Sequence, residues 1–156
     1  NPKKLYVIEK DNELANELKT KYNQQFTIIN DDILKIDENL LFNNKVTVFG
    51  NLPYNISTEI LSKWIVSLKQ SFWFEHLILM FQKEVADRII AKLNTSSYGR
   101  LSIICNWKLN IRKICDIKPD SFFPKPNVES SLLFLYPKKN FQFLDCHQIT
   151  LHLYLL

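Results

Sequence analysis

Short apolar runs alternate with helical periodicities through the first two thirds of the chain. Four such runs predict strands, at residues 5–8, 26–29, 46–49 and 77–81. Helices with candidate N-caps at Asp11 and Ser57 follow the first and third runs, and a helix that continues to Leu93 follows the fourth. The strands are apolar on both faces, which is typical of a parallel sheet covered by helices on both sides. The pattern therefore predicts an α/β fold.

The last third of the chain has a different pattern. Trp107, Leu109 and Ile111 alternate with polar residues and predict a strand, and residues 128–136 predict another. The segment between them, residues 120–127, contains two prolines and predicts a stiff loop. These features predict an antiparallel strand pair added to an otherwise parallel sheet.

Only two of the 156 residues are glycine, which excludes a glycine-rich phosphate-binding loop within this sequence. The net charge of +4 permits a polyanionic partner without requiring one. The three cysteines (Cys105, Cys115 and Cys146) have no C-x-x-C spacing, so neither a disulfide framework nor a metal site is predicted. The sequence shows no leader and no apolar run of membrane-spanning length, and we expect a cytoplasmic monomer without membrane contacts.

Carboxylates follow the first two predicted strands. Glu9 comes directly after the first strand, and Asp32 comes soon after the second. Ligands of open α/β sheets bind at this end of the strands. One carboxylate can accept hydrogen bonds from both hydroxyls of a ribose, and a second can accept from the exocyclic amine of adenine. Acidic residues also favour the helix N-termini that follow strands, so each residue has a structural interpretation as well.

The segment Asn51–Tyr54 follows the third predicted strand and has the composition of a receptor for a planar amine. Pro53 lacks an N–H and biases Leu52 toward an extended backbone, so carbonyl oxygens here can face outward. The Asn51 side chain adds an acceptor, and Tyr54 adds a flat ring. Two accepted hydrogen bonds favour a pyramidal nitrogen whose lone pair points at an electrophilic methyl group. A turn that simply ends the strand is the structural alternative.

The segment Val48–Ser57 (VFGNLPYNIS) resembles the catalytic motif of ribosomal RNA adenine dimethyltransferases. In particular, it is similar to the enzymes that dimethylate two adjacent adenosines near the 3′ end of small-subunit rRNA. Further segments agree in order and spacing, at residues 7–9, 81–85, 98–102 and 122–130. The resemblance covers residues 3–137 and implies a Rossmann-like class I methyltransferase fold. It also implies rRNA or a pre-ribosomal small subunit as the partner, and S-adenosylmethionine as the cofactor.

The resemblance implies roles for individual residues at the cofactor. Glu9 would bind the ribose hydroxyls of S-adenosylmethionine, and Asp32 would bind its adenine amine. Asn51 would lie between the cofactor and the target base, and so contribute to both sites. No metal is implied in the reaction.

The resemblance implies further roles at the target base. The Asn51 side chain and the Pro53 region would hold the target amine, while Tyr54 would stack on the extruded base. Phe122 would close the other face of that base. Of the two adjacent phenylalanines, we expect Phe122 in the pocket and Phe123 in the core.

Compared with the family pattern, we expect the chain to begin after the first strand and its glycine-rich turn, and to lack the small helical C-terminal domain. Residues 1–137 are therefore expected to form a partial catalytic domain, and residues 138–156 an atypical tail. The absent strand would lie between the strands that end at Glu9 and Asn51. We therefore expect the chain alone to bind cofactor weakly.

Other functions share some of these features. A non-catalytic RNA-binding or ribosome-assembly module would keep the fold, and would bind RNA in a salt-sensitive manner that does not depend on Asn51. A nicotinamide dehydrogenase would share the ribose-binding acid but would not use the segment Asn51–Tyr54. Methyltransferases for DNA adenine or protein glutamine use related motifs, but Leu52 and the F-x-P-x-P spacing favour rRNA.

Overall fold

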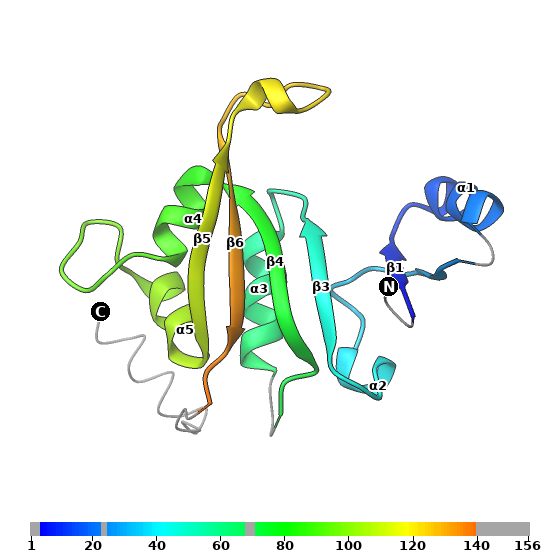
Figure 1. Cartoon of the computed structure of the whole chain (residues 1–156), viewed down its shortest axis with the longest axis horizontal. Coiled ribbons are helices and arrows are strands. Elements are labelled where there is room, and N and C mark those ends of the chain that lie inside the picture. Colours follow the sequence, from blue (N-terminus) through cyan, green and yellow to red (C-terminus); the bar gives the residue numbers. More distant parts are fainter. Residues whose placement is uncertain (1–3, 23–24, 68–70, 140–156) are drawn as a thin grey trace. The chain divides into compact units, whose positions relative to one another are not determined.

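The computed structural model describes residues 4–22, 25–67 and 71–139 (Figure 1). The chain divides into two compact units, residues 1–43 and residues 44–156. Of the tail expected at residues 138–156, all but the first two residues lie outside the described part of the chain. No helix in the described part is long and apolar enough to cross a membrane.

The first unit holds a small parallel sheet and two helices. In chain order these elements are β1 (Tyr6–Glu9), α1 (Asn12–Tyr22), β2 (Thr27–Asn30) and α2 (Glu38–Leu41). Asp11 caps α1 as the sequence predicted, because its Oδ1 accepts the Leu14 N–H at 2.8 Å. The sequence predicted buried strands at residues 5–8 and 26–29, but the corresponding strands β1 and β2 are at most half-buried. Within the described residues each pairs along one edge only, and Ala15 is the one fully buried side chain of α1.

The second unit is built on a four-stranded sheet. Its elements are β3 (Val46–Asn51), α3 (Ser57–Val66), β4 (Phe74–Gln82), α4 (Lys83–Ile89), α5 (Arg100–Lys108), β5 (Leu109–Ile117), a 3-10 helix (Pro119–Ser121) and β6 (Ser130–Pro137). The strand order is β3-β4-β6-β5; β3 and β4 are parallel, and β6 is antiparallel to both of its neighbours. This confirms the predicted α/β fold with parallel early strands and a late antiparallel pair.

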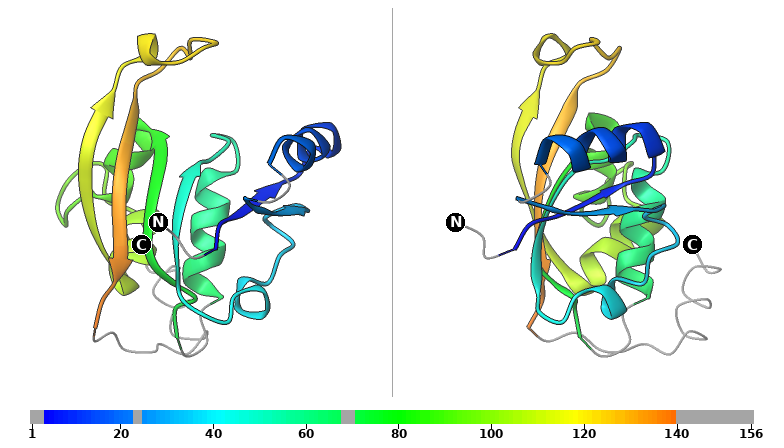
Figure 2. Two further views of the ribbon diagram at one scale, coloured as in Figure 1. Left: turned by 45° about the vertical axis from the view of Figure 1, so that its right-hand side comes forward. Right: turned by 90° about the vertical axis from the view of Figure 1, so that its right-hand side faces the viewer.

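Helices α3, α4 and α5 lie on one face of this sheet (Figure 2). The core between these layers consists of fully buried apolar side chains from α3, β4 and β6, namely Ile60, Leu61, Ile65, Leu77, Leu79, Phe81, Leu133 and Leu135. The strand pattern predicted helices on both faces. Within the described part of this unit, the other face of β3 instead exposes Thr47, Phe49 and Asn51, which alternate with half-buried neighbours.

Three local features differ from the sequence pattern. Trp107 lies in α5 rather than in a strand, because α5 continues to Lys108 and meets β5 without connecting residues. The alternating pattern therefore spans a helix–strand junction. Helix α4 ends at Ile89, before Leu93, which is exposed. Ser57 is the first residue of α3 and not its N-cap, and its side chain makes no capping hydrogen bond.

Candidate functional site

The first wall of the candidate site is the turn after β3. Asn51 is the last residue of β3 and lies opposite Met80 of β4. The chain then turns at Pro53, whose carbonyl accepts the Ile56 N–H at 3.1 Å, and α3 begins directly afterwards. This connection places Asn51 and Tyr54 at the carboxyl end of a parallel strand, where ligands bind in α/β folds.

Gly50 allows this wall to lie close to the core. A Cβ atom at this position would lie 2.7 Å from Leu79 Cδ2 and 3.0 Å from Leu52 Cδ2. Leu79 is fully buried in β4, so it cannot move away without disturbing its neighbours. The close approach therefore favours glycine directly before Asn51.

The second wall is the connection between β5 and β6, which projects beyond the end of the sheet (Figure 1). Asp120 and Lys125 form an ion pair across this connection, with 2.5 Å between Oδ1 and Nζ. Pro124 and Pro126 restrict the backbone on either side of Lys125. The segment therefore presents its side chains from a restricted backbone.

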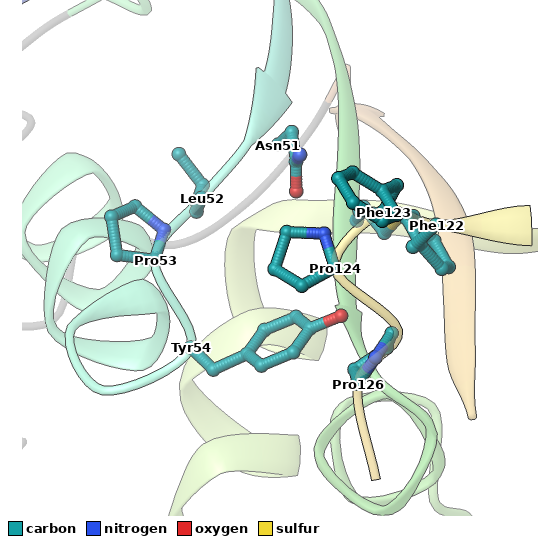
Figure 3. A pocket seen from close by; sticks show the side chains of 9 residues that line it. Asn51, Leu52, Pro53, Tyr54, Phe122, Phe123, Pro124 and Pro126 are labelled. Carbon is teal, nitrogen blue, oxygen red and sulfur yellow. The ribbon is translucent and has the colours of Figure 1, made fainter. Parts of the chain in front are cut away.

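A pocket of about 340 Å³ lies between the two walls (Figure 3). It is lined by Asn51, Leu52, Pro53, Tyr54, Met80, Phe122, Phe123, Pro124 and Pro126. This volume is near the lower end of the range for small-molecule sites, roughly 300–1,000 Å³. Within the described residues the Asn51 side chain makes no hydrogen bond, and Figure 3 shows its amide on the pocket side of β3. The pocket thus combines apolar and aromatic side chains with the Asn51 amide, which can form a hydrogen bond with a ligand.

A hydrogen bond joins the first wall to the sheet. The Tyr54 hydroxyl lies 2.7 Å from the hydroxyl of Ser130, the first residue of β6, and either group can donate. The Tyr54 carbonyl also accepts a hydrogen bond from the Ser57 hydroxyl at 3.2 Å. Tyr54 is therefore held at its backbone and at the far end of its ring.

Four of the residues that the sequence singled out line this pocket: Asn51, Pro53, Tyr54 and Phe122. The expectation that Phe123 packs in the core is wrong. Phe123 is fully exposed, and it lies at the pocket beside Phe122. The reason is that a connection projecting beyond the sheet has no core in which to bury a second ring.

Sequence reasoning missed Met80, Pro124 and Pro126 as lining residues. The two prolines belong to the F-x-P-x-P spacing, so that motif was the available signal. Met80 is one of several apolar residues in a predicted strand. Only the register that pairs it with Asn51 places it at the pocket.

In the first unit, Glu9 ends β1 and Asp32 follows β2 by two residues. Oε1 of Glu9 accepts the Asp11 N–H at 2.8 Å, and within the described residues Oε2 accepts no hydrogen bond. Oδ2 of Asp32 pairs with Lys10 Nζ at 2.8 Å, and Oδ1 accepts the Leu34 N–H at 3.0 Å. The hydrogen bond from Lys10, followed by that from Leu34, lowers the pKa of Asp32. Asp32 is therefore ionised at neutral pH and acts only as an acceptor.

The part of the chain that the structure describes contains no group of three His, Cys, Asp or Glu side chains arranged to hold a metal ion.

Comparisons with known proteins place the chain in a family. The model of the ribosomal RNA adenine dimethylase family matches residues 1–149. The chain belongs to this family. It is 63% identical over 140 residues to the ribosomal RNA small subunit methyltransferase A of Pelagibacter ubique strain HTCC1062, covering 90% of the chain and 53% of that protein. The protein of the same name from Wolbachia sp. subsp. Drosophila simulans strain wRi is 42% identical, covering 88% and 50%. The chain thus spans about half the length of these curated relatives.

Solved structures agree with membership of the adenine dimethylase family. A dimethyladenosine transferase from Plasmodium falciparum is 30% identical, with a TM-score of 0.75, covering 88% of this chain and 49% of its own. The 23S rRNA methyltransferase ErmE is 19% identical, with a TM-score of 0.71, covering 99% and 60%. At that identity ErmE supports the fold alone. Together these structures confirm the predicted Rossmann-like methyltransferase fold.

Proposed function

We propose that this chain supplies the target-base pocket, and carboxylates for the cofactor, of an S-adenosylmethionine-dependent enzyme that dimethylates N6 of adenosines in small-subunit rRNA. The family and the names of its curated relatives support this reaction and substrate. One observation carries the proposal for the chain itself: Asn51 and Tyr54 line the same pocket as Phe122 (Figure 3).

The acceptors of the first wall suit the exocyclic amine of adenine. The side-chain oxygen of Asn51 accepts one N–H of that amine. The carbonyls of Pro53 and Tyr54 already accept hydrogen bonds within the turn, so the Leu52 carbonyl supplies the second acceptor. Accepting both N–H groups withdraws the nitrogen lone pair from the purine ring and directs it at an electrophilic methyl group. A strong base is unnecessary, because the methylated nitrogen is cationic and loses its proton easily.

The aromatic side chains suit the faces of the same base. Chemistry on a base in structured RNA requires that the base leave its stack. Tyr54 on one wall and Phe122 on the other offer new stacking partners, each worth about 1–3 kcal/mol per base. These contacts offset the cost of extrusion, and they hold the amine at the acceptors of the first wall.

The carboxylates of the first unit fit the adenosyl part of S-adenosylmethionine. Glu9 retains Oε2 as an acceptor for ribose hydroxyls, while Asp32 is held ionised by Lys10 and can accept from an adenine amine. When bound, S-adenosylmethionine supplies a methyl group on a sulfonium, which needs no further activation. The role of these residues is to bind and orient the cofactor.

The test is methyl incorporation from labelled S-adenosylmethionine into immature small-subunit particles. We expect Asn51→Ala to reduce incorporation by about tenfold or more, because the target amine loses a hydrogen bond that directs its lone pair. Asn44→Ala is the matched control, because Asn44 is an exposed asparagine of the same unit that lies outside the motif of residues 48–57 and does not line the pocket. The control should retain wild-type incorporation.

Equal incorporation by the wild type and Asn51→Ala would contradict the role given to Asn51. Absence of incorporation by the wild type, together with salt-sensitive RNA binding that Asn51→Ala leaves unchanged, would instead favour the non-catalytic RNA-binding module.

A further inference from the structure

The hydrogen bond between Tyr54 and Ser130 joins residues 76 positions apart in the chain. Tyr54 lies in the turn after β3, and Ser130 begins β6. The bond is 2.7 Å long and involves a side chain that lines the pocket and one that is fully buried. Ser130 does not line the pocket, but its hydroxyl contacts the side chain of Tyr54, which does.

The backbone around Ser130 is fixed from both sides. Ser130 is opposite Gln82 of β4 and Ile117 of β5, the two neighbours of β6. The preceding residue, Glu129, accepts the Lys83 N–H at 2.9 Å. The Ser130 hydroxyl thus projects from paired sheet, whereas Tyr54 projects from a turn.

We propose that Ser130 is a positioning residue that holds the Tyr54 ring in orientation for stacking on the target base. This inference rests on the proposed function of the pocket. The phenolic oxygen lies on the long axis of the ring, so a partner at that oxygen fixes where the axis points. The O–H bond of a phenol favours the plane of its ring, so a directed bond also restricts rotation about the axis. Both faces of the ring remain free of the anchoring group.

Ser131, the next residue, provides a comparison because its hydroxyl bonds within the sheet and not to a residue of the pocket. Ser131 is also fully buried and also uses its hydroxyl, which donates to Asp116 Oδ1 at 2.5 Å. Successive residues of a strand point to opposite faces, so Ser131 does not share the direction of Ser130. Its partner Asp116 lies on β5 and does not line the pocket. Ser131→Ala is therefore a matched control for Ser130→Ala.

The experiment uses the full 156-residue chain and a single-stranded RNA in which 2-aminopurine replaces the target adenosine. This base keeps the purine faces but carries its amine at C2 instead of C6, so it probes stacking apart from the amine contacts. Stacking on Tyr54 quenches the emission of this base, so the titration measures stacking without turnover. We expect Ser130→Ala to weaken the affinity by about two- to tenfold, which corresponds to one net hydrogen bond. Tyr54→Phe keeps the stacking faces but loses the hydroxyl, so it should weaken the affinity by the same factor.

Non-additivity separates positioning from a general structural effect. The double variant Ser130→Ala/Tyr54→Phe should bind no more weakly than the weaker single variant, because both changes remove the same bond. Ser131→Ala should keep the wild-type affinity and quenching, even where urea unfolding shows reduced stability. If Ser130→Ala fails to fold, Tyr54→Phe still tests the bond from the pocket side.

If Ser130→Ala and Tyr54→Phe both quench the probe as the wild type does, the positioning role is overturned and the proposed function is left intact. Additive losses in the double variant, or an equal loss in Ser131→Ala, would also overturn it. Failure of the wild-type chain to quench the probe would overturn the positioning role, because no base then stacks on Tyr54. The proposed function is tested separately, by methyl incorporation in the wild type and Asn51→Ala.

Discussion

Replacing Gly50 by alanine tests how closely the pocket wall approaches the core. The new Cβ would lie 2.7 Å from Leu79 Cδ2 and 3.0 Å from Leu52 Cδ2, and contacts below 3.0 Å require a shift of one partner. Leu79 is fully buried, so the shift must occur within the core. Overpacking of this kind costs about 1–3 kcal/mol. The reduced entropy of the unfolded chain offsets about 0.4–1 kcal/mol. We expect a net loss of about 1–2 kcal/mol in the free energy of unfolding.

The assay is urea unfolding followed by tryptophan fluorescence. All three tryptophans lie in the second unit, and Trp64 and Trp73 are buried with their rings 5.4 Å apart. The signal therefore reports the unit that contains Gly50. Because Leu52 lines the pocket, the same substitution should also weaken quenching of the 2-aminopurine RNA.

Two further variants make the prediction specific. At Gly99, the other glycine of the chain, a Cβ atom would have no neighbour within 4 Å, so Gly99→Ala should change stability by less than about 0.5 kcal/mol. In a Leu79→Ala background the space beside Gly50 is open, so Gly50→Ala should cost less there than in the wild type. If Gly50→Ala is as stable as the wild type, or if its effect adds fully to that of Leu79→Ala, the packing argument is wrong.

Two other predictions concern Asp32, a proposed cofactor-binding carboxylate, and Phe123 at the rim of the pocket. The pKa of Asp32 is lowered from its ordinary value of 3.8, and the hydrogen bond from Lys10 is the largest cause. The ionised carboxylate therefore stabilises the fold above pH 3.8, and this stabilisation is lost as the pH falls through the lowered pKa. In Lys10→Met this loss should begin at higher pH, and an NMR titration of the Asp32 carboxyl should show a raised midpoint; an unchanged midpoint would contradict the assigned cause. Phe123 is fully exposed, so Phe123→Ala should change the free energy of unfolding by less than about 0.5 kcal/mol. A loss above about 1 kcal/mol in urea unfolding would show that this ring packs in solution.

Local signals were sufficient to predict the first wall of the site. An apolar strand followed by Asn51, Leu52, Pro53 and Tyr54 already indicated a strand end, an extended backbone and outward acceptors. The structure places these residues at the end of β3, where α/β folds bind ligands. Proline and asparagine act on their immediate neighbours, so their effect could be derived from the sequence.

The second wall depends on contacts that no local pattern encodes. The F-x-P-x-P spacing indicated a stiff loop, but it did not distinguish a buried Phe123 from an exposed one. The partnership of Tyr54 with Ser130 depends on β6 inserting between β4 and β5, which is a property of strand order rather than of periodicity. Trp107 shows the same limit, because an alternating pattern is ambiguous where a helix meets a strand directly.

The pocket draws its walls from connections that leave β3 and β5, the two edge strands of the four-stranded sheet. A molecule held between the turn after β3 and the β5–β6 connection would bind only when β3, β4 and β6 are assembled, so occupancy is linked thermodynamically to the integrity of the whole sheet. Such a ligand would raise the unfolding free energy by RT ln(1 + [L]/Kd) and would slow amide hydrogen exchange far from its contacts. Protection spread through the buried strands, rather than confined to the rim, would be the signature of a base seated in this cleft.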